Sequence, residues 1–513
     1  MSASTEKKLR QAAREAGTDK KTLAMLEEEK KRAKSKLRWT LGTVGVCLLI
    51  ALILFLNSGL LYKTAAYSVG DRSYSAAEMN YQYANQYYTL ANQYGSYASM
   101  FGLDVGLAAL GDNACAFSEG TWRDYFLSSA ESTMLQMTAL VDYAKANGLA
   151  LDEAELAEIE DSFTGVDEAA KLQGYANADR LFAVNYGPGV NTEIIKAAYR
   201  DSSLAAKALT QVSDSFEYTP EQLQEEYASY AGEKDIFDYA SYYVAAATVE
   251  TTDAEGNTSS APTEETLAEA KASAQAIETA YKAGKGTDYL ARLSEAVAAE
   301  IPEAEATEQS AAGGSLGDYK EWMMSASREA GDVAVTEQSS GGGFYVTVFV
   351  SRSDNAYPTA NVRHILIKAV ASEDGSYSDE AKATAKARAE ELLAQWQAGD
   401  LTEESFAALA EEFSEDGGSN TNGGLYGDIA KGQMVQEFED FCFAGHKPGD
   451  TDIVYGESGS YAGYHVVYFV GQGENYCDSI ARAALSNADL ESFLTGLQAN
   501  YQTAERFGIR FVG

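Results

Sequence analysis

Two histidines in apolar, strand-like segments are the residues of this sequence that most clearly suggest chemistry. His364 lies in VRHILI and His465 lies in GYHVVYF. A buried imidazole is costly unless it is hydrogen-bonded, so one such residue alone would usually be structural. Two of them in strand segments of one small region predict a pair of rings that face each other. Two unrelated structural histidines are the alternative interpretation.

A carboxylate and several apolar side chains lie between the two histidines in the sequence. Asp416 occurs in a segment rich in Gly, Ser and Asn, and Tyr426, Met434 and Phe438 follow it. These three side chains can form an apolar pocket next to the polar cluster. Because Met434 and Phe438 are spaced i to i+4, they are equally consistent with an ordinary helix core. The pattern therefore predicts polar groups beside an apolar pocket, with plain core packing as the alternative.

The composition excludes several other classes of protein. The chain has 513 residues, 45% of them hydrophobic, and a net charge of −38. This content indicates folded domains, about three at ~150 residues each. So acidic a chain lacks the general basic surface that nucleic-acid binding needs. The four cysteines form no CxxC pair, the three histidines leave little room for a metal centre, and no nucleotide-binding motif is present. We expect no metal and no cofactor.

The N-terminal region carries the opposite charge. Residues 1–38 have a net charge of +6, which leaves −44 on the rest of the chain. Segment 39–62 has 24 residues and no charged side chain, enough for a helix to cross a ~30 Å hydrocarbon core. A cleaved signal peptide is the alternative, but its apolar core is usually shorter. We predict a transmembrane helix at 39–62, with residues 1–38 in the cytoplasm and the rest outside the cell membrane.

Residues 63–235 have mostly helical patterns. Nine tyrosines fall between positions 62 and 97; a packed helical face explains them, and a surface that holds non-native chains is the alternative. The sequence Thr219-Pro220-Glu221-Gln222 predicts a helix start, because it combines an N-cap threonine, a proline in the first turn and a glutamine three residues after the cap. The last segment, 475–513, has apolar residues at helical spacing, and we expect it to pack on the 63–235 domain.

From residue 236 onward the chain contains two copies of one pattern. Each copy opens with a β-like run, continues through an Ala-rich helix and a short helix, reaches a glycine turn and closes with an apolar strand. The copies cover 236–352 and 353–474, and their closing strands are GGFYVTVFV and AGYHVVYFV. This order predicts a compact α+β domain in each copy. The predicted fold class is therefore α+β, with two tandem domains of one topology.

The second copy resembles the parvulin, or PpiC-type, peptidyl-prolyl isomerases. The motifs VRHILI, FAALAEEFSEDGGSNTNGG, KGQMVQEFEDFCF, KPGD and GYHVVYF match the family in order and spacing across residues 355–473. The whole chain resembles PrsA-type extracytoplasmic foldases and, more distantly, SurA. In those proteins a helical chaperone domain is made from N- and C-terminal segments around parvulin domains. The resemblance implies that 63–235 and 475–513 form such a domain.

The resemblance also implies roles for individual residues. The family's paired histidines fall on His364 and His465, and its acidic or cysteine position falls on Asp416. Its proline pocket falls on four positions, Tyr426, Ile429, Met434 and Phe438. Tyr426 stands where leucine is common, and Ile429 stands where the family often has an aromatic residue. These two departures concern the specificity of the pocket and leave the fold unaffected.

The activity that the resemblance implies is cis/trans isomerisation of X–Pro peptide bonds, without a cofactor. The implied partners are unfolded or newly secreted polypeptides, with no nucleic acid, and a homodimer stays open. The protein would act at the outer face of the cell membrane. A non-enzymatic holdase of the cell envelope is the alternative, and a purely structural envelope protein is the third interpretation.

The first copy departs from the family pattern. Tyr242 stands near the place of His364, and Tyr345 stands at the place of His465. A phenol does not titrate near pH 7, so it cannot replace a histidine pair. The segment KGQMVQEF has no counterpart in this copy. We therefore expect a degenerate, inactive parvulin-like domain that spaces the other domains or extends a client-binding surface.

Overall fold

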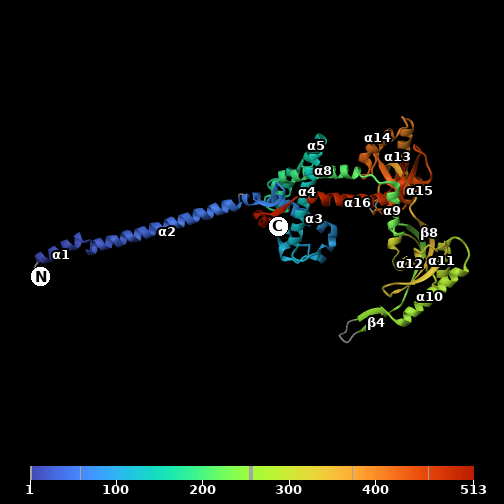
Figure 1. Cartoon of the computed structure of the whole chain (residues 1–513), viewed down its shortest axis with the longest axis horizontal. Helices are drawn as coiled ribbons and strands as arrows, with labels where there is room; N and C mark the ends of the chain where they lie inside the picture. Colours follow the sequence, from blue (N-terminus) through green and yellow to red (C-terminus); the bar gives the residue numbers. More distant parts are fainter. Residues whose placement is uncertain (1–2, 58, 253–257, 373, 460) are drawn as a thin grey trace. The chain divides into compact units, whose positions relative to one another are not determined.

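The computed structural model describes residues 3–57, 59–252, 258–372, 374–459 and 461–513. The chain divides into two compact units. Unit 1 comprises Met1–Phe216 and Asp489–Gly513, and unit 2 comprises Glu217–Ala488. Figure 1 shows the elements of both units along the chain.

The boundary between the units differs from the predicted one at 235/236. Helix α9 (Pro220–Ser229) begins with the predicted capping box, in which the Thr219 hydroxyl accepts from Gln222 N and the Gln222 side chain accepts from Thr219 N. This helix belongs to unit 2 because the Tyr227 hydroxyl donates to the buried Asp235 carboxylate at 3.1 Å and accepts from the Asn355 amide at 3.1 Å. The second boundary falls within α16 (Tyr476–Gln498), not at 474/475.

Unit 1 is mainly helical and includes a small antiparallel sheet of order β13-β1-β2. Strand β13 comes from the C-terminal segment and pairs with β1, with Tyr67 opposite Glu505. Trp122 and Phe126 are fully buried at the centre of its core. The elements are α1 (Ala3–Glu15), α2 (Lys20–Asn57), β1 (Ala65–Val69), β2 (Arg72–Ser75), α3 (Ala76–Tyr94), η2 (Gly95–Phe101), η3 (Leu107–Asp112), α4 (Trp122–Ala146), α5 (Glu153–Asp161), α6 (Val166–Leu172), α7 (Ala178–Asn185), α8 (Thr192–Asp214), the end of α16 and β13 (Thr503–Glu505).

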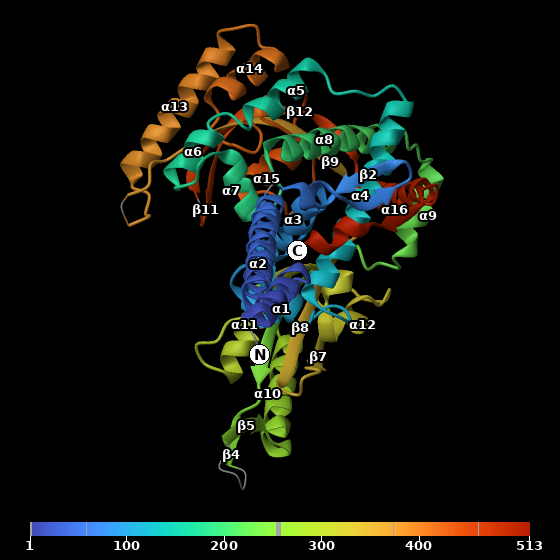
Figure 2. The same ribbon diagram turned by 90° about the vertical axis from the view of Figure 1, so that its left-hand side faces the viewer.

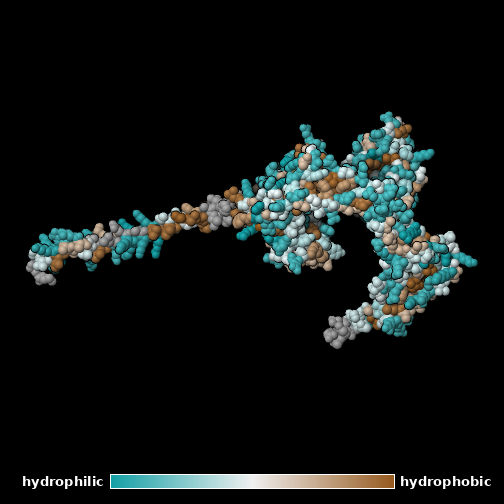
Figure 3. All heavy atoms as spheres, in the orientation of Figure 1, coloured by the Kyte–Doolittle hydropathy of each residue, from teal (hydrophilic) through white to brown (hydrophobic). Residues whose placement is uncertain are grey.

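Helix α2 contains most of the segment that was predicted to span a membrane. Its first part carries hydrophilic side chains and the part after them is apolar, as Figure 3 shows along the helix. Trp39 and Leu48 on the apolar part are 77% and 66% exposed. In the described part of the chain, no helix combines the length and the apolar character that a membrane crossing needs. The predicted span includes residues 51–58, whose side chains lie outside the description.

Unit 2 contains two four-stranded antiparallel sheets. Their strand orders are β6-β3-β8-β7 and β10-β9-β12-β11. If the four strands of each sheet are numbered in chain order, both sheets have the order 2-1-4-3. We call the two copies the first and second repeats. The elements are β3 (Ile236–Ala245), β4 (Thr248–Thr252), β5 (Thr258–Pro262), α10 (Glu264–Ala283), α11 (Tyr289–Glu300), β6 (Thr307–Ala312), α12 (Lys320–Met323), β7 (Val333–Glu337) and β8 (Gly343–Ser353), then β9 (Pro358–Lys368), α13 (Asp379–Gln397), α14 (Glu403–Phe413), β10 (Leu425–Ile429), α15 (Gln436–Phe443), β11 (Thr451–Ser458) and β12 (Tyr461–Asn475).

The sheet of the second repeat is covered on both faces. Side chains alternate between the faces along each strand. Ile365 and Val466 point to the face covered by α13 and α14, where they pack with Trp396 and Phe406. Val362 and Val467 point to the opposite face, where they pack with Phe438 of α15. Figure 2 shows α13 and α14 together beside this sheet. His364 and His465 are each two residues from Val362 and Val467, respectively, so their side chains point to the face covered by α15.

Strand register corrects one correspondence between the repeats. His364 pairs with Val467 in the second repeat, and Ser241 pairs with Thr347 at the same place in the first. Ser241, rather than the predicted Tyr242, is therefore the counterpart of His364. Tyr242 packs on the other face with the core beneath α10. The prediction erred by one residue, and a shift of one residue in a strand moves a side chain to the opposite face.

Candidate active site

The two predicted histidines lie on neighbouring strands and contact each other. His364 on β9 and His465 on β12 are diagonal neighbours, because His465 pairs with Leu366. Their Nδ1 atoms are 2.9 Å apart, and the residues are 2% and 5% exposed. Gly424 allows the adjacent strand to approach: its carbonyl accepts from His364 N at 2.8 Å, and its φ is +72°. A Cβ at that position would lie 2.2 Å from the His364 carbonyl oxygen.

Asp416 completes a hydrogen-bonded cluster on the outer side of His364. It lies in the turn after α14, and its Oδ2 atom is 3.0 Å from His364 Nε2. The hydroxyls of Ser419 and Tyr426 donate to the same oxygen at 2.6 and 3.0 Å. The hydrogen bond with His364, followed by those from Ser419 and Tyr426, holds the pKa of Asp416 well below its usual range. Asp416 is therefore ionised at neutral pH.

The hydrogen bonds of the cluster run in one direction. An ionised Asp416 accepts from His364 Nε2, so a neutral His364 has an unprotonated Nδ1 that accepts from His465 Nδ1. The remaining nitrogen of His465, Nε2, then accepts from the Tyr461 hydroxyl at 3.0 Å. Burial, and secondly the neighbouring His364, lower the pKa of His465 to about 3, which keeps this ring neutral. The chain of donors fixes one tautomer for each histidine.

An open cavity of about 470 Å³ borders this cluster. Its apolar wall comes from Phe438 and Met434, and Tyr426 and Leu366 also line it. The Phe438 ring stands nearly perpendicular to both histidine rings, at 88° to His364 and 79° to His465. A cavity with one apolar wall and a few fixed polar groups is typical of a ligand site.

The structure brings most of the predicted site residues together, with one exception. His364, Asp416, Tyr426, Met434, Phe438 and His465 all line the cavity. Ile429 does not: it is 1% exposed and packs in the core with Ala360 and Val362. Ile429 ends strand β10 on the side that faces this core, so its predicted contact with a substrate is replaced by a packing role.

Sequence reasoning missed two residues that bond directly to the cluster. Tyr461 precedes His465 by four residues on β12, and an even spacing on a strand places both side chains on one face. That spacing was a usable signal. Ser419 lies among glycines and asparagines in the loop after Asp416. No spacing rule singles it out, because the loop conformation decides which hydroxyl reaches the histidine.

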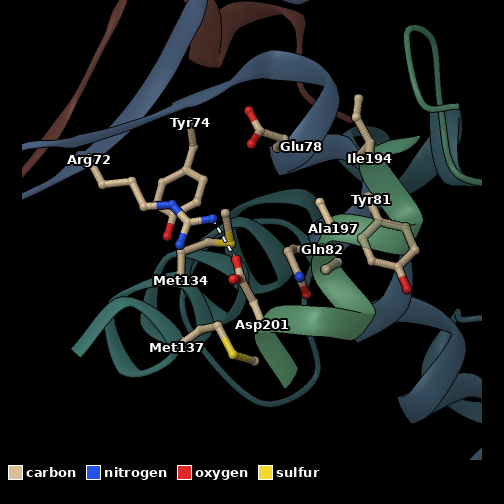
Figure 4. Close-up of a pocket in the computed structure, with 11 residues that line it drawn as sticks. Arg72, Tyr74, Glu78, Tyr81, Gln82, Met134, Met137, Ile194, Ala197 and Asp201 are labelled. Atoms are coloured by element: carbon tan, nitrogen blue, oxygen red, sulfur yellow. Dashed lines mark hydrogen bonds and ion pairs between the residues drawn. The ribbon is translucent and has the colours of Figure 1, made fainter. Parts of the chain in front are cut away.

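A second cavity lies in unit 1, among side chains of β2, α3, α4 and α8 (Figure 4). Met134 and Met137 contribute to its apolar side, and Arg72 and Asp201 form an ion pair of 2.5 Å at its edge. The accessible space is about 30 Å³, which is room for about two water molecules. This cavity has no space for a proline ring, in contrast to the one beside the histidines.

Comparison with known proteins links the second repeat to a family. Residues 344–472 match the family model of the PPIC-type PPIase domain. The chain is 40% identical over 103 residues to the chaperone SurA of Alcanivorax borkumensis, which covers 20% of this chain and 21% of that protein. It is 33% identical over 138 residues to the foldase protein PrsA 1 of Listeria innocua, which covers 27% of this chain and 39% of that protein.

One solved structure matches a larger share of the chain, at lower sequence identity. PrsA from Bacillus subtilis is 12% identical and matches 75% of this chain and 91% of its own, with a TM-score of 0.25. A score this low does not establish a shared overall fold, so the relationship rests on the sequence matches. The chain covers about a fifth and two fifths of the lengths of the two curated relatives. Residues 344–472 therefore match the PPIC-type PPIase family, and over part of its length the chain is similar to SurA and PrsA proteins.

Proposed function

We propose that this protein is an extracytoplasmic foldase whose second repeat isomerises X–Pro peptide bonds and whose unit 1 holds unfolded clients. One observation carries the catalytic part of the proposal. The cavity of the second repeat places an apolar wall, Phe438 and Met434, beside a hydrogen-bonded histidine pair and the Asp416 carboxylate. The first repeat has the same topology without this combination.

The reaction needs no bond to break, which suits a site without a strong nucleophile. Rotation about an amide bond has a barrier of ~18–20 kcal/mol, because the planar state is stabilised by resonance. In the twisted state this resonance and its charge separation are lost. The apolar wall of the cavity favours the less polar, twisted state over the planar one. Phe438 and Met434 would grip the proline ring while the preceding carbonyl rotates.

Asp416 would act through its charge rather than by forming a covalent bond. Its Oδ2 atom already accepts hydrogen bonds from Ser419 and Tyr426 and its pKa is low, so it is a weak nucleophile. The carboxylate repels the partial negative charge that resonance places on a nearby peptide oxygen, and this destabilises the planar state. The histidine pair would hold the carboxylate in position. Each of these roles is part of the proposal.

A protease-coupled assay with the full chain and an X–Pro tetrapeptide tests the catalytic part. We expect the wild-type chain to accelerate the cis-to-trans step and Asp416→Ala to reduce kcat/KM at least about tenfold, equivalent to ~1.4 kcal/mol of transition-state stabilisation. A folded Asp416→Ala variant with wild-type kcat/KM would refute the role of the carboxylate. A wild-type chain without activity would favour the holdase alternative.

The location of the protein is a separate part of the proposal. Segment 39–62 has no charged residue and follows a basic stretch; on this basis it would anchor the chain in the cell membrane, with the units outside. Fractionation of cells that express the full chain should place it in the membrane pellet after a high-salt wash. A mature N-terminus near Tyr67 would instead show that the segment is a cleaved signal.

A further inference from the structure

Unit 1 has a cluster of aromatic and methionine side chains at its surface, in which three exposed side chains lie beside three half-buried rings that also pack on the core. We name it the aromatic patch; its members are Tyr94, Tyr97, Met100, Phe101, Phe117 and Tyr125. Tyr97, Met100 and Phe117 are 65%, 75% and 41% exposed. The segment that carries most of them forms the light-blue loops that follow α3 in Figure 1.

Ring contacts join four members of the patch, Tyr94, Phe101, Phe117 and Tyr125. The ring of Tyr94 lies 4.6 Å from Phe101 and 5.8 Å from Phe117, measured between centroids. Phe117 in turn contacts Tyr125 at 6.2 Å. In a 3-10 helix, residues three apart are eclipsed, so Tyr97 and Met100 on η2 lie on the same edge. The ring contacts are therefore continuous from Tyr94 at the end of α3 to Tyr125 near the start of α4, and Tyr97 and Met100 are exposed on the 3-10 helix between Tyr94 and Phe101.

Buried residues hold the segment in place, which leaves the exposed side chains of Tyr97, Met100 and Phe117 free to bind. Leu103 and Leu110 are 1% and 0% exposed and anchor the loops in the core. The Trp122 indole donates to the Phe101 carbonyl at 2.9 Å, and the Tyr87 hydroxyl donates to the Val105 carbonyl at 2.7 Å. A surface ordered in this way loses little conformational entropy when a ligand binds.

Charge around the patch indicates the kind of partner. The sequence has no lysine or arginine between Arg72 and Arg123, and the Arg123 guanidinium donates to the Val512 carbonyl at 2.7 Å. Asp104, Asp112 and Glu119 are exposed in the same loops. An apolar surface in loops that carry acidic side chains and no lysine or arginine repels anionic lipid and a second copy of this acidic chain, and it attracts cationic groups.

We propose that the aromatic patch binds segments of unfolded polypeptide that combine apolar side chains with lysine or arginine. The inference rests on the proposed holding function and names the class of client segment that unit 1 selects. Met100 and the aromatic rings can contact varied apolar side chains, since methionine adapts its shape and aromatic faces also attract cations. Asp104, Asp112 and Glu119 would attract the lysine or arginine side chains of the client.

The test measures binding of a fluorescent, proline-free peptide of alternating Phe, Leu and Lys residues to the full chain. We expect Tyr97→Ser/Met100→Ser to raise the Kd at least about tenfold, as loss of aromatic anchor residues does at other interfaces. The matched control is Leu172→Ser/Val184→Ser, which removes two exposed apolar side chains elsewhere in unit 1 and should leave the Kd unchanged. A peptide with Glu in place of Lys should bind at least about tenfold more weakly than the Lys peptide at low salt.

Three outcomes would overturn the inference. The first is an unchanged Kd for the patch variant, and the second is an equal loss in the control variant. The third is a patch-dependent association with phosphatidylcholine/phosphatidylglycerol vesicles that exceeds peptide binding. If the wild-type chain binds neither peptide, the holding function itself fails. Activity on an X–Pro peptide should be unchanged in the patch variant, which separates this surface from the isomerase site.

Discussion

The two repeats of unit 2 share a topology and differ in the face of the sheet that could do chemistry. In the second repeat this face carries His364, His465 and an open cavity beside α15. In the first repeat the corresponding strand positions hold Ser241 and Tyr345. The sheet order is the same in both. A common fold therefore does not determine function, which depends on the side chains of one face.

Tyrosines and glutamines form the polar contacts of that face in the first repeat. The Tyr239 and Tyr319 hydroxyls are 2.8 Å apart, and the Tyr243 hydroxyl donates to Gln338 at 2.6 Å. Burial raises the pKa of Tyr319 above its usual value, so this phenol stays neutral. Met323 of the short helix α12 is 0% exposed and packs in the core. At this face the first repeat therefore has hydrogen bonds between neutral groups. Its sequence contains no histidine, so it has no equivalent of the Asp416–His364 contact.

The largest expected effect comes from the apolar wall. In the full chain, Met434→Ala/Phe438→Ala should lower kcat/KM for an X–Pro peptide at least about 100-fold, because both contacts with the proline ring are lost. The matched control is Met323→Ala, which truncates a buried methionine in the first repeat and should leave kcat/KM unchanged.

Folding must be checked in the same experiment. Phe438 is 2% exposed, so its truncation is expected to cost ~3–5 kcal/mol of stability. Circular dichroism monitors the fold, and Phe438→Leu provides a variant that fills more of the space. A folded double variant that retains full activity would exclude the proposed pocket.

The second prediction compares the pH dependence of unfolding. The pKa of His465 is about 3 in the folded state and ~6.5 in an unfolded chain, so unfolding takes up a proton between these values. The stability that this group contributes is complete above pH ~6.5 and falls as the pH is lowered, by up to ~1.4 kcal/mol per pH unit. The first repeat has Tyr345 at this position and should lack this contribution. Variants that keep only Trp396 or only Trp322 report on the second and first repeats, respectively.

The control for this comparison is His465→Gln, which removes the titrating ring. Its second repeat should lose the additional slope between pH 4.5 and 6.5, a range above the titration of most carboxylates. If the Trp396 and Trp322 signals follow the same pH dependence in the wild-type chain, the buried neutral His465 is not supported.

A smaller effect is expected from Tyr461. Tyr461→Phe keeps the ring and removes the hydroxyl that donates to His465 Nε2. Loss of one such bond is worth about 1 kcal/mol, so we expect kcat/KM to fall about fivefold. The tautomer of His465, read from ¹⁵N chemical shifts, should become mixed, which a purely structural effect would not cause. Tyr345→Phe in the first repeat is the control and should change neither quantity.

The smallest expected effect is that of restoring histidines to the first repeat. Ser241→His/Tyr345→His places two histidines at the register positions of His364 and His465. We expect no added isomerase activity when this pair is introduced into a chain whose second repeat carries Met434→Ala/Phe438→Ala. The first repeat still has no counterpart of the Phe438 wall. Activity above that of the inactive parent would show that the histidines alone carry the chemistry.

Much of the second repeat could be predicted from sequence, because its strands have a clear period of two and its histidines stand out in apolar runs. The pairing of His364 with His465 and the wall formed by Phe438 follow from those patterns. Ile429 could not be placed, since an apolar residue at a strand end fits either a pocket or a core. Ser241 was missed because Ser241 and Tyr242 are adjacent in one β-like run, and the face to which each points follows from the pairing of β3 with β8.

Catalysed rotation about X–Pro bonds is the activity that we propose for the second repeat. Two-dimensional exchange NMR on an X–Pro peptide, with the full chain at a small fraction of the peptide concentration, tests it without a coupling protease. Uncatalysed exchange takes tens to hundreds of seconds, and we predict exchange cross-peaks within about a second in the presence of the wild-type chain. Exchange that stays at the uncatalysed rate while the peptide resonances show binding would contradict the account.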